Sequence, residues 1–356
     1  MKIASMIGAR PNFIKCAALS RTIRKEHTEI LVHTGQHYDY LMDKVFFDEL
    51  SIPTPDYHLN VGSGSHGQQT GEMLKKIEEV LLKEKPDMAL VYGDTNTTIA
   101  GALAAAKMHI PVAHVEAGLR SFDRTMPEEI NRVLTDHCSD LLFCPTDAAV
   151  RNLKAEGITK GVSNTGDVMV ETLENNRRIA EKSDILEKLK LKKKGYIVAT
   201  VHRAGNTDQK ENLENIVSAF LDSGEKIVFP VHPRVEKYLK EYGLYGKLEK
   251  NIILTKPLGY LEFLKLTSSA KKILTDSGGV QKEAYMLKVP CITMRENTEW
   301  VETVEDGWNV LVGADREKIE NAIKEFAPEK EQKSSYGKGD AGEKIVKAIN
   351  KTFNYS

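Results

Sequence analysis

The chain has 356 residues, with 41% hydrophobic and 28% charged side chains, a composition typical of a globular protein with substantial cores. Lys and Arg number 50 against 51 Asp and Glu, so the basic face of a nucleic-acid-binding protein is not expected. No apolar run reaches the ~20 residues that span a bilayer, so no membrane association is expected, and the length predicts two domains.

The N-terminal segment could be a secretory signal or a buried strand. Arg10, Asn12 and Lys15 interrupt its apolar residues and no small-residue cleavage site follows, so a buried first strand is favoured. The cysteines form no C-x-x-C pair and lie in segments expected to be buried, namely Cys16, Cys138, Cys144 and Cys291. Such cysteines are typical apolar fillers in a reducing compartment, so the chain is predicted to be cytoplasmic.

Short β-branched runs alternate with helix-length amphipathic segments along almost the whole chain. In the first half, strands are expected at residues 3–7, 30–34, 88–92, 112–115, 141–144 and 162–164, with helices such as 97–107 and 128–137 between them. In the second half, strands are expected at residues 196–201, 227–231, 252–254, 273–274, 291–294 and 310–312. Strands separated by helices form parallel sheets, so the pattern predicts two doubly wound, Rossmann-type α/β domains.

A polar stretch at residues 171–194 is the predicted join between the domains. It places an N-terminal domain at residues 1–170 and a C-terminal domain at residues 171–339. The end of the second domain is polar and loop-like, and a final amphipathic helix is expected at residues 340–356. Asp340 is its expected N-cap, and its apolar face carries Ile345, Val346, Ile349 and Phe353.

Polar residues follow most of the predicted strands. In open α/β sheets, ligands bind beyond the carboxyl ends of the strands, so these residues are candidate ligand contacts. They are Gly8-Ala9-Arg10, Gly35-Gln36-His37, Gly93-Asp94, Glu116-Ala117-Gly118, His202-Arg203, His232-Pro233-Arg234, Asp276-Ser277-Gly278-Gly279 and Arg295-Glu296. Both halves contribute such an edge, and the two edges are expected to face each other across one central cleft.

Two of these strand ends suit an anionic group. Ser277-Gly278-Gly279 opens a helix whose N–H groups could hold a diphosphate, although an ordinary strand-to-helix turn is the alternative. Pro11 suits the first turn of a helix, which brings Arg10 and Lys15 near a helix N-terminus, although a solvated cationic pair is the alternative. No G-x-G-x-x-G follows the first strand, so a nicotinamide is not expected and no cofactor is predicted.

Carboxylates gather at the strand ends of the first half. Asp94 and Glu116 end successive strands, and Glu128 and Glu129 open the next helix. A helix cap is the favoured interpretation for Asp94 taken alone, and Glu129 is expected to be solvated. Glu116 stands between apolar residues, where a charge needs a function. Acids from different elements at one sheet edge favour acid/base chemistry.

His202 and His232 each end a strand of the second half. A lone histidine is more often a structural hydrogen-bonding group than a catalyst. Neither is accompanied by an H-E-x-x-H motif or a carboxylate cluster of metal-ligand spacing, so no metal is predicted.

Nine of these motifs, taken together and in this order, resemble the non-hydrolysing UDP-N-acetylglucosamine 2-epimerases. They are Gly8-Ala9-Arg10-Pro11, Thr34-Gly35-Gln36-His37, Val91-Tyr92-Gly93-Asp94-Thr95, His114-Val115-Glu116-Ala117-Gly118-Leu119-Arg120, Met126-Pro127-Glu128-Glu129-Ile130-Asn131-Arg132, Val201-His202-Arg203, Pro230-Val231-His232-Pro233, Pro257-Leu258-Gly259-Tyr260 and Asp276-Ser277-Gly278-Gly279-Val280-Gln281. The resemblance implies a GT-B-like fold, usually a homodimer, in which the terminal helix crosses back to the first domain.

The resemblance also implies a reaction, the interconversion of UDP-N-acetylglucosamine and UDP-N-acetylmannosamine by inversion at C2. UDP leaves C1 as a base removes the C2 proton, giving 2-acetamidoglucal, and UDP then re-adds with a proton delivered to the opposite face. Two acid/base groups are needed, and Asp94, Glu116 and Glu128 are the candidates, with no assignment of which is base and which is acid. The product feeds cell-envelope or surface polysaccharides in this family.

Further roles are carried over from the resemblance. His202, Arg10, Lys15 and the Ser277-Gly278-Gly279 helix end are expected to stabilise the departing diphosphate. The remaining substrate contacts it implies are Glu283 on the ribose, Phe263 and the Leu258 backbone on the uracil, and Arg132 and His232 in supporting positions. Gln36 and His37 match the region where bacterial members bind an activating second substrate molecule.

The chain departs from the family pattern at two places. Asn12 stands where an acid is frequent, and Trp300 replaces an arginine that holds the phosphates in bacterial members. Trp300 either stacks on the ligand or packs in the core, and Arg295 could supply part of the lost charge. The rival functions are a GT-B glycosyltransferase using a UDP-sugar donor, a hydrolysing epimerase that releases N-acetylmannosamine, and a non-enzymatic nucleotide-sugar sensor.

Overall fold

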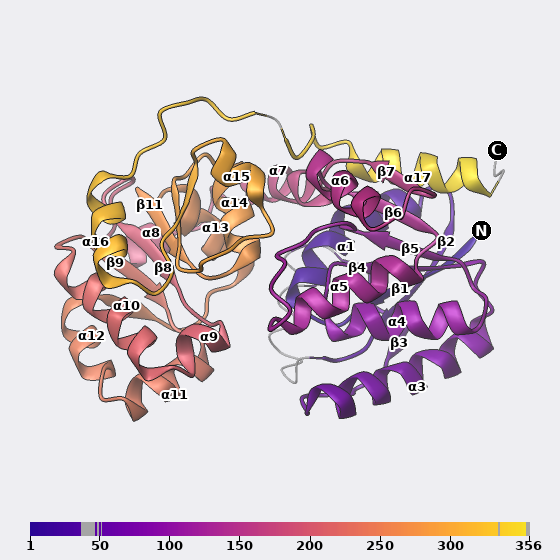
Figure 1. The fold of residues 1–356 in the computed structure, drawn as a ribbon, viewed down its shortest axis with the longest axis horizontal. Helices are drawn as coiled ribbons and strands as arrows, with labels where there is room; N and C mark the ends of the chain where they lie inside the picture. Colours follow the sequence, from indigo (N-terminus) through magenta and orange to yellow (C-terminus); the bar gives the residue numbers. More distant parts are fainter. Residues whose placement is uncertain (37–46, 48–49, 51, 334, 354–356) are drawn as a thin grey trace. The chain divides into compact units, whose positions relative to one another are not determined.

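The computed structural model describes the chain except residues 37–46, 48–49, 51, 334 and 354–356. The chain divides into two compact units, Met1–Asn175 with Ser334–Ser356, and Asn176–Lys333. Each unit is built on one parallel β-sheet flanked by helices (Figure 1).

The first unit contains a seven-stranded sheet in the order β3-β2-β1-β4-β5-β6-β7. Its strands are β1 (Lys2–Ile7), β2 (Thr28–His33), β3 (Tyr57–His58), β4 (Met88–Tyr92), β5 (Val112–Val115), β6 (Leu141–Cys144) and β7 (Val162–Asn164). Its helices among the described residues are α1 (Arg10–Ile23), α3 (His66–Glu84), α4 (Asn96–Lys107), α5 (Pro127–Cys138), α6 (Asp147–Ala155) and α17 (Ala341–Thr352). Strands β4, β5 and β6 are buried throughout, as is usual for parallel strands covered on both faces.

The helix α7 (Val168–Ala180) carries the chain from the first unit into the second. The second unit contains a six-stranded sheet in the order β10-β9-β8-β11-β12-β13. Its strands are β8 (Ile197–Thr200), β9 (Ile227–Pro230), β10 (Ile253–Thr255), β11 (Lys272–Thr275), β12 (Cys291–Thr293) and β13 (Asn309–Leu311). Its helices are α8 (Ile185–Lys188), α9 (Ala204–Thr207), α10 (Lys210–Asp222), α11 (Pro233–Glu241), α12 (Tyr245–Asn251), α13 (Tyr260–Ser268), α14 (Gly278–Met286), α15 (Val301–Glu305) and α16 (Arg316–Glu325).

The direction of winding reverses once in each sheet. In the first unit the reversal lies between β1 and β4, which pair in parallel with Met6 opposite Val91. In the second unit it lies between β8 and β11, with Ala199 opposite Leu274. Helices on the two sides of such a switch point leave opposite faces of the sheet, and the crevice between them is the usual ligand position.

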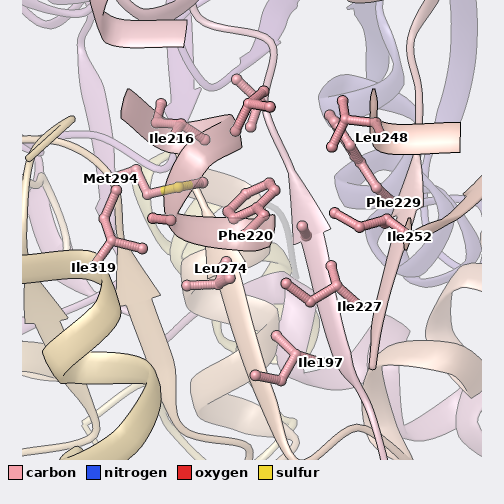
Figure 2. Close-up of a cluster of buried hydrophobic side chains, with 14 of the residues drawn as sticks. Ile197, Ile216, Phe220, Ile227, Phe229, Leu248, Ile252, Leu274, Met294 and Ile319 are labelled. Atoms are coloured by element: carbon pink, nitrogen blue, oxygen red, sulfur yellow. The ribbon is translucent and has the colours of Figure 1, made fainter. Parts of the chain in front are cut away.

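Apolar side chains from the sheet and its helices form the core of each unit. In the second unit, Phe220 of α10 meets Phe229 of β9 edge to face, with the ring centroids 6.1 Å apart. Figure 2 shows these two rings among aliphatic side chains such as Ile227, Leu274 and Met294. A comparable cluster in the first unit packs the sheet against α3 and α4. The carboxyl ends of the strands in each sheet are therefore held in place by a closely packed core.

Four strands of the first unit, β4, β5, β6 and β7, lie at their predicted bounds. The short strand β3 was not predicted, because two residues that follow Pro53 and Pro55 carry no readable pattern. The final helix ends at Thr352, so Phe353 lies just beyond it. Asp340 occupies the N-cap position, but its carboxylate pairs with Lys344 at 3.0 Å rather than with a helix N–H.

The helix α17 packs against α1 of the first unit. Asn350 donates a hydrogen bond to Glu26 at 2.7 Å, and the Gly342 N–H donates to Glu171 at 3.3 Å. Across the described ranges, no helix combines the length and the apolar character needed to cross a membrane.

Candidate active site

Asp94 lies directly after β4 at the switch point of the first unit. Helix α5 holds it at two atoms: Arg132 donates to its carboxylate at 2.5 Å, and Asn131 donates to its backbone carbonyl at 3.0 Å. Thr95 is the residue that caps α4, accepting a hydrogen bond from the Thr98 N–H. The interpretation of Asp94 as a helix cap is therefore wrong. The Asp94 side chain is about a quarter exposed (27%), and its carboxylate is paired with a buried arginine.

Glu116 follows β5, the neighbour of β4. Its side chain is buried and forms an ion pair with Lys15 of α1, which is buried as well. Its backbone has a φ of +75°, a conformation rare for a residue with a side chain and frequent at functional sites. A Cβ placed on Gly93 would fall 2.6 Å from the Lys15 amino group and 3.1 Å from the Glu116 carboxylate. The Lys15–Glu116 pair thus lies directly against the turn that carries Asp94.

The two acids that open α5 have different environments. Glu128 is half-buried. Glu129 is buried, and its carboxylate accepts hydrogen bonds at 2.9 Å from the Ser121 N–H, the Ser121 hydroxyl and the Phe122 N–H. The prediction that Glu129 is solvated is wrong, because the loop after β5 folds over the first turn of α5 and its donors converge on this carboxylate. Glu129 also accepts from Arg132 at 3.1 Å, so it orients the arginine that holds Asp94.

In the second unit, the switch point is organised by Asp276, a strand-end residue to which the sequence analysis assigned no role of its own. Asp276 follows β11, is fully buried and accepts hydrogen bonds from the backbone N–H groups of His202 and Arg203 at 3.0–3.1 Å. The His202 ring nitrogen Nδ1 lies 3.1 Å from the same carboxylate. Burial alone would raise the pKa of Asp276, but the His202 contacts and the backbone N–H groups outweigh it and lower the pKa. Asp276 therefore fixes the orientation of the exposed imidazole of His202.

Helix α14 begins at Gly278, beside Asp276. Ser277 is its N-cap and makes no side-chain hydrogen bond to the helix, so the N–H groups of the first turn remain for a ligand. A Cβ on Gly278 would collide with the Glu299 carboxylate, whereas a Cβ on Gly279 would meet nothing nearer than the Ser277 hydroxyl at 4.0 Å. A side chain at the first of these two positions would therefore displace the Glu299 carboxylate, whereas one at the second would not.

Glu283 and Lys282 lie one turn further along α14. Burial raises the pKa of Glu283 to about 7, and the charge of Lys282 only partly opposes this shift. Lys282 is fully buried, with its amino group 4.2 Å from the centre of the Trp300 ring. Trp300 is itself only 3% exposed, so of the two interpretations of this departure the structure favours packing in the core. Arg295 pairs with Glu299 at 2.9 Å.

The other predicted residues lie at separate positions. His232 caps α11 by accepting a hydrogen bond from the Arg234 N–H at 3.3 Å, and Leu258 and Phe263 pack against the core beside β11. The Gln36 side chain accepts hydrogen bonds from the N–H and hydroxyl of Thr97 at 3.1 and 2.9 Å. Arg10 is the first residue of α1, but its side chain, like all of His37, lies outside the described part of the chain.

The family profile described as UDP-N-acetylglucosamine 2-epimerase matches residues 21–350. The chain belongs to this family. The UDP-N-acetylglucosamine 2-epimerase homolog of Methanococcus maripaludis is 63% identical over 354 residues, which cover 98% of this chain and 99% of that protein. The UDP-2,3-diacetamido-2,3-dideoxy-D-glucuronate 2-epimerase of Pseudomonas aeruginosa is 48% identical over 362 residues, which cover 99% of this chain and all of that epimerase (100%).

A crystal structure of Methanocaldococcus jannaschii UDP-GlcNAc 2-epimerase, in complex with UDP-GlcNAc and UDP, superimposes with a TM-score of 0.94 at 50% identity. The match covers 99% of this chain and 100% of that epimerase chain. The predicted GT-B-like class, with two doubly wound α/β units, is confirmed, and so is the predicted membership of the 2-epimerase family.

Proposed function

We propose that the chain is an isomerase that interconverts UDP-N-acetylglucosamine and UDP-N-acetylmannosamine by inverting C2 of the sugar. The observation that carries the proposal is the pair of carboxylates at the ends of adjacent strands β4 and β5. Asp94 is paired with Arg132 and Glu116 with Lys15, and both cations are buried. A site with two carboxylates held at fixed positions suits a reaction that moves a proton on and off one carbon. Membership of the 2-epimerase family supports the same reaction.

The reaction proceeds by elimination and addition. The C1–O bond to UDP breaks and UDP leaves with the bonding electrons, which makes the C2 hydrogen acidic. A carboxylate takes that proton and the C1=C2 bond of 2-acetamidoglucal forms. UDP then attacks C1 while a second acid delivers a proton to the other face of C2. Asp94, Glu116 and Glu128 share these proton transfers.

The second unit holds the UDP part of the substrate. The N–H groups at the start of α14, behind Ser277, Gly278 and Gly279, face the diphosphate, and His202, oriented by Asp276, stabilises the charge on the leaving UDP. Glu283 accepts hydrogen bonds from the ribose hydroxyls, which repays the cost of burying its carboxylate. The sequence resemblance adds Arg10 to the diphosphate contacts, with Phe263 and the Leu258 backbone around the uracil. Arg132 acts through Asp94, and His232 is a supporting contact.

A second candidate substrate is UDP-2,3-diacetamido-2,3-dideoxy-D-glucuronate. The P. aeruginosa relative named for it is 48% identical, the same value as for the UDP-N-acetylglucosamine 2-epimerase of M. maripaludis. Both substrates carry UDP and a C2 acetamido group and differ at C3 and C6, so the C2 chemistry is common to them. Comparing kcat/KM for the two compounds with the same protein preparation decides between them.

The proposal also covers the setting of the enzyme. The four cysteines are free, which suits a reducing cytoplasm. The resemblance supports a homodimer, which light scattering of the purified protein tests directly.

The resemblance also places an activating second substrate molecule at Gln36 and His37. The side-chain oxygen of Gln36 already accepts two hydrogen bonds from Thr97 of α4, so such a molecule would have to bind without breaking these hydrogen bonds.

Deuterium incorporation tests the reaction. In D2O, with neither NAD nor metal added, the protein is expected to convert UDP-N-acetylglucosamine into its C2 epimer and to place deuterium at C2 of both. Product that keeps its original C2 hydrogen would contradict solvent-exchanging proton transfer. Release of free N-acetylmannosamine would indicate a hydrolysing epimerase. Transfer of the sugar to an added acceptor would indicate a glycosyltransferase, and binding of the nucleotide sugar without turnover would indicate a sensor.

A further inference from the structure

His114 is a fully buried histidine in the middle of β5, and the proposed reaction does not yet use it. Both of its ring nitrogens face oxygen acceptors at 2.7 Å. Nδ1 meets the Asp136 carboxylate, and Nε2 meets the backbone carbonyl of Gly93. A neutral imidazole has only one N–H, so both hydrogen bonds are made only when the ring carries a proton on each nitrogen.

Asp136 is the centre of this buried network. It lies on α5, four residues after Arg132, and accepts from the Gly118 N–H at 3.1 Å and from Arg120 at 2.7 Å. Its own burial would raise its pKa, but the contacts with His114 and Arg120 outweigh that and lower it. Arg120 in turn pairs with Glu156 at 2.6 Å. Asp136 and Glu156 thus provide the two carboxylates of a buried network that also contains His114 and Arg120.

The network joins the two turns that carry the proposed catalytic carboxylates. Through His114 it holds the carbonyl of Gly93, the residue before Asp94. Through Asp136 it holds the N–H of Gly118, two residues after Glu116. The Cα of Gly93 faces the Lys15–Glu116 pair, so a shift of this peptide would displace both carboxylates together.

We propose that His114 and Asp136 form a charged positioning pair that sets the relative placement of Asp94 and Glu116, with His114 held as an imidazolium by its two acceptors. The proposal rests on the proposed epimerase reaction, because proton removal and delivery at one carbon require that the two carboxylates keep a fixed separation. Neither residue touches the substrate. Their effect passes through the Gly93 carbonyl and the Gly118 N–H.

Removing the pair therefore affects the rate more than binding. With glutamine in place of His114, the Gly93 carbonyl loses a charged donor and the turn is free to relax. A displacement on the order of 1 Å at a reacting group costs about 10²-fold in rate. The UDP-binding residues of the second unit make none of these contacts and stay in place.

The protonation state can be measured without any assay of activity. The chain contains 10 histidines, so selective ¹⁵N labelling of their rings gives a countable NMR spectrum. The resonance lost in His114→Gln or shifted in Asp136→Asn is expected to show protons on both nitrogens at neutral pH. A single protonated nitrogen would overturn the charged pair, whether or not the protein proves to be an epimerase.

Kinetics test the positioning role. In His114→Gln and Asp136→Asn, kcat is expected to fall about 10- to 100-fold while KM changes less than about threefold. The double variant should be no slower than the slower single variant, because the two residues act as one unit. His137→Gln makes the same exchange at an exposed residue beside Asp136 on α5 and should leave kcat unchanged.

Three outcomes would overturn the positioning role. One is an unchanged kcat in both variants. Another is a loss of activity that only follows the folded fraction measured by circular dichroism, since a purely structural role does not alter the turnover of folded molecules. The third is fully additive losses in the double variant. A wild-type protein that epimerises neither nucleotide sugar would instead refute the proposed function, and the ring-protonation measurement would still stand by itself.

Discussion

The two units place different kinds of groups at equivalent positions of their sheets. At the switch point of the first unit, charged side chains are locked in ion pairs, Lys15 with Glu116 and Arg132 with Asp94. At the switch point of the second unit, backbone N–H groups at the start of α14 and the buried acid Glu283 predominate. The same fold thus supports one edge dominated by side-chain ion pairs and another at which the backbone dipoles of a helix N-terminus lie beside buried acids.

This difference matches the two tasks of the proposed reaction. Proton transfer needs groups whose charge and position are fixed before the substrate arrives. Binding a nucleotide needs donors that follow the shape of a diphosphate, and a helix N-terminus supplies these without side chains. The comparison therefore predicts that changes in the first unit lower turnover and that changes in the second unit lower affinity.

The largest effect is expected from the carboxylates of the first unit. Asp94→Asn, Glu116→Gln and Glu128→Gln keep the shape of each side chain but prevent proton transfer, so each should lower kcat by roughly 10²–10⁴-fold with substrate binding largely intact. One variant is expected to accumulate 2-acetamidoglucal and UDP. The exposed Glu79→Gln serves as the control. Near-normal turnover in all three variants would mean that these carboxylates are structural.

The next effect concerns the stability of the second unit. Trp300→Arg removes a buried ring and sets a second cation beside Lys282, so the free energy of unfolding should fall by about 3–5 kcal/mol. The half-buried Trp308, whose indole donates to the Lys330 carbonyl at 2.8 Å, provides the matched control, since Trp308→Arg should cost much less. Urea unfolding measures both. A stable Trp300→Arg protein with improved substrate affinity would show that the position faces the ligand.

Substitutions at two adjacent glycines test whether the backbone N–H groups at the start of α14 bind the diphosphate. Gly278→Ala forces the Glu299 carboxylate to move at the start of α14 and should weaken UDP binding about tenfold, or about 1.4 kcal/mol. A methyl group at residue 279 would meet no close neighbour, so Gly279→Ala should change the affinity for UDP less than about threefold. Titration calorimetry with UDP compares the two. Equal effects would show that the start of α14 does not form the diphosphate site.

The smallest effect is a pH dependence of affinity. The pKa of Glu283 is raised to about 7, so the carboxyl of the free protein takes up a proton as the pH falls below 7. Ribose hydroxyls donate to the ionised form, and binding below pH 7 must therefore release that proton. UDP affinity should weaken between pH 7.5 and 6, by at most about tenfold per pH unit. Glu283→Gln cannot ionise, and subtracting its profile removes the titration of UDP itself. Identical pH profiles of UDP affinity for the wild type and Glu283→Gln would show that Glu283 does not bind the ribose.

The elements that the sequence predicted best share a physical cause. Strands such as Met88–Tyr92 and Leu141–Cys144 are short apolar runs between polar turns, and burial on both faces makes that pattern readable. The strand Tyr57–His58 and the single-turn helix Ala204–Thr207 were missed, because elements this short depend on their neighbours rather than on their own residues.

The site was predicted in part for the same reason. A polar residue after an apolar strand stands out, and this signal singled out Asp94, Glu116 and His202. The partners of these residues carry no such signal. Glu129 looked solvated, yet it is buried under donors from the Ser121–Phe122 loop. Asp276 could be seen at a strand end in the sequence. Its contact with His202 could not, because that contact depends on the pairing of β8 with β11, which brings the two strand ends together.

The sequence by itself determined the class of fold, the family and the types of reactive group, because strand periodicity, motif order and residue chemistry are local properties of the chain. Only the tertiary structure decided which polar groups are paired: Lys15 with Glu116, Arg132 with Asp94, and the His114 ring with Asp136. Ion pairing between distant residues depends on strand order and on the placement of α5 across several strand ends. The state of a buried group such as Glu283 likewise depends on the surroundings that packing creates, since burial acts on its charged form and not on its identity.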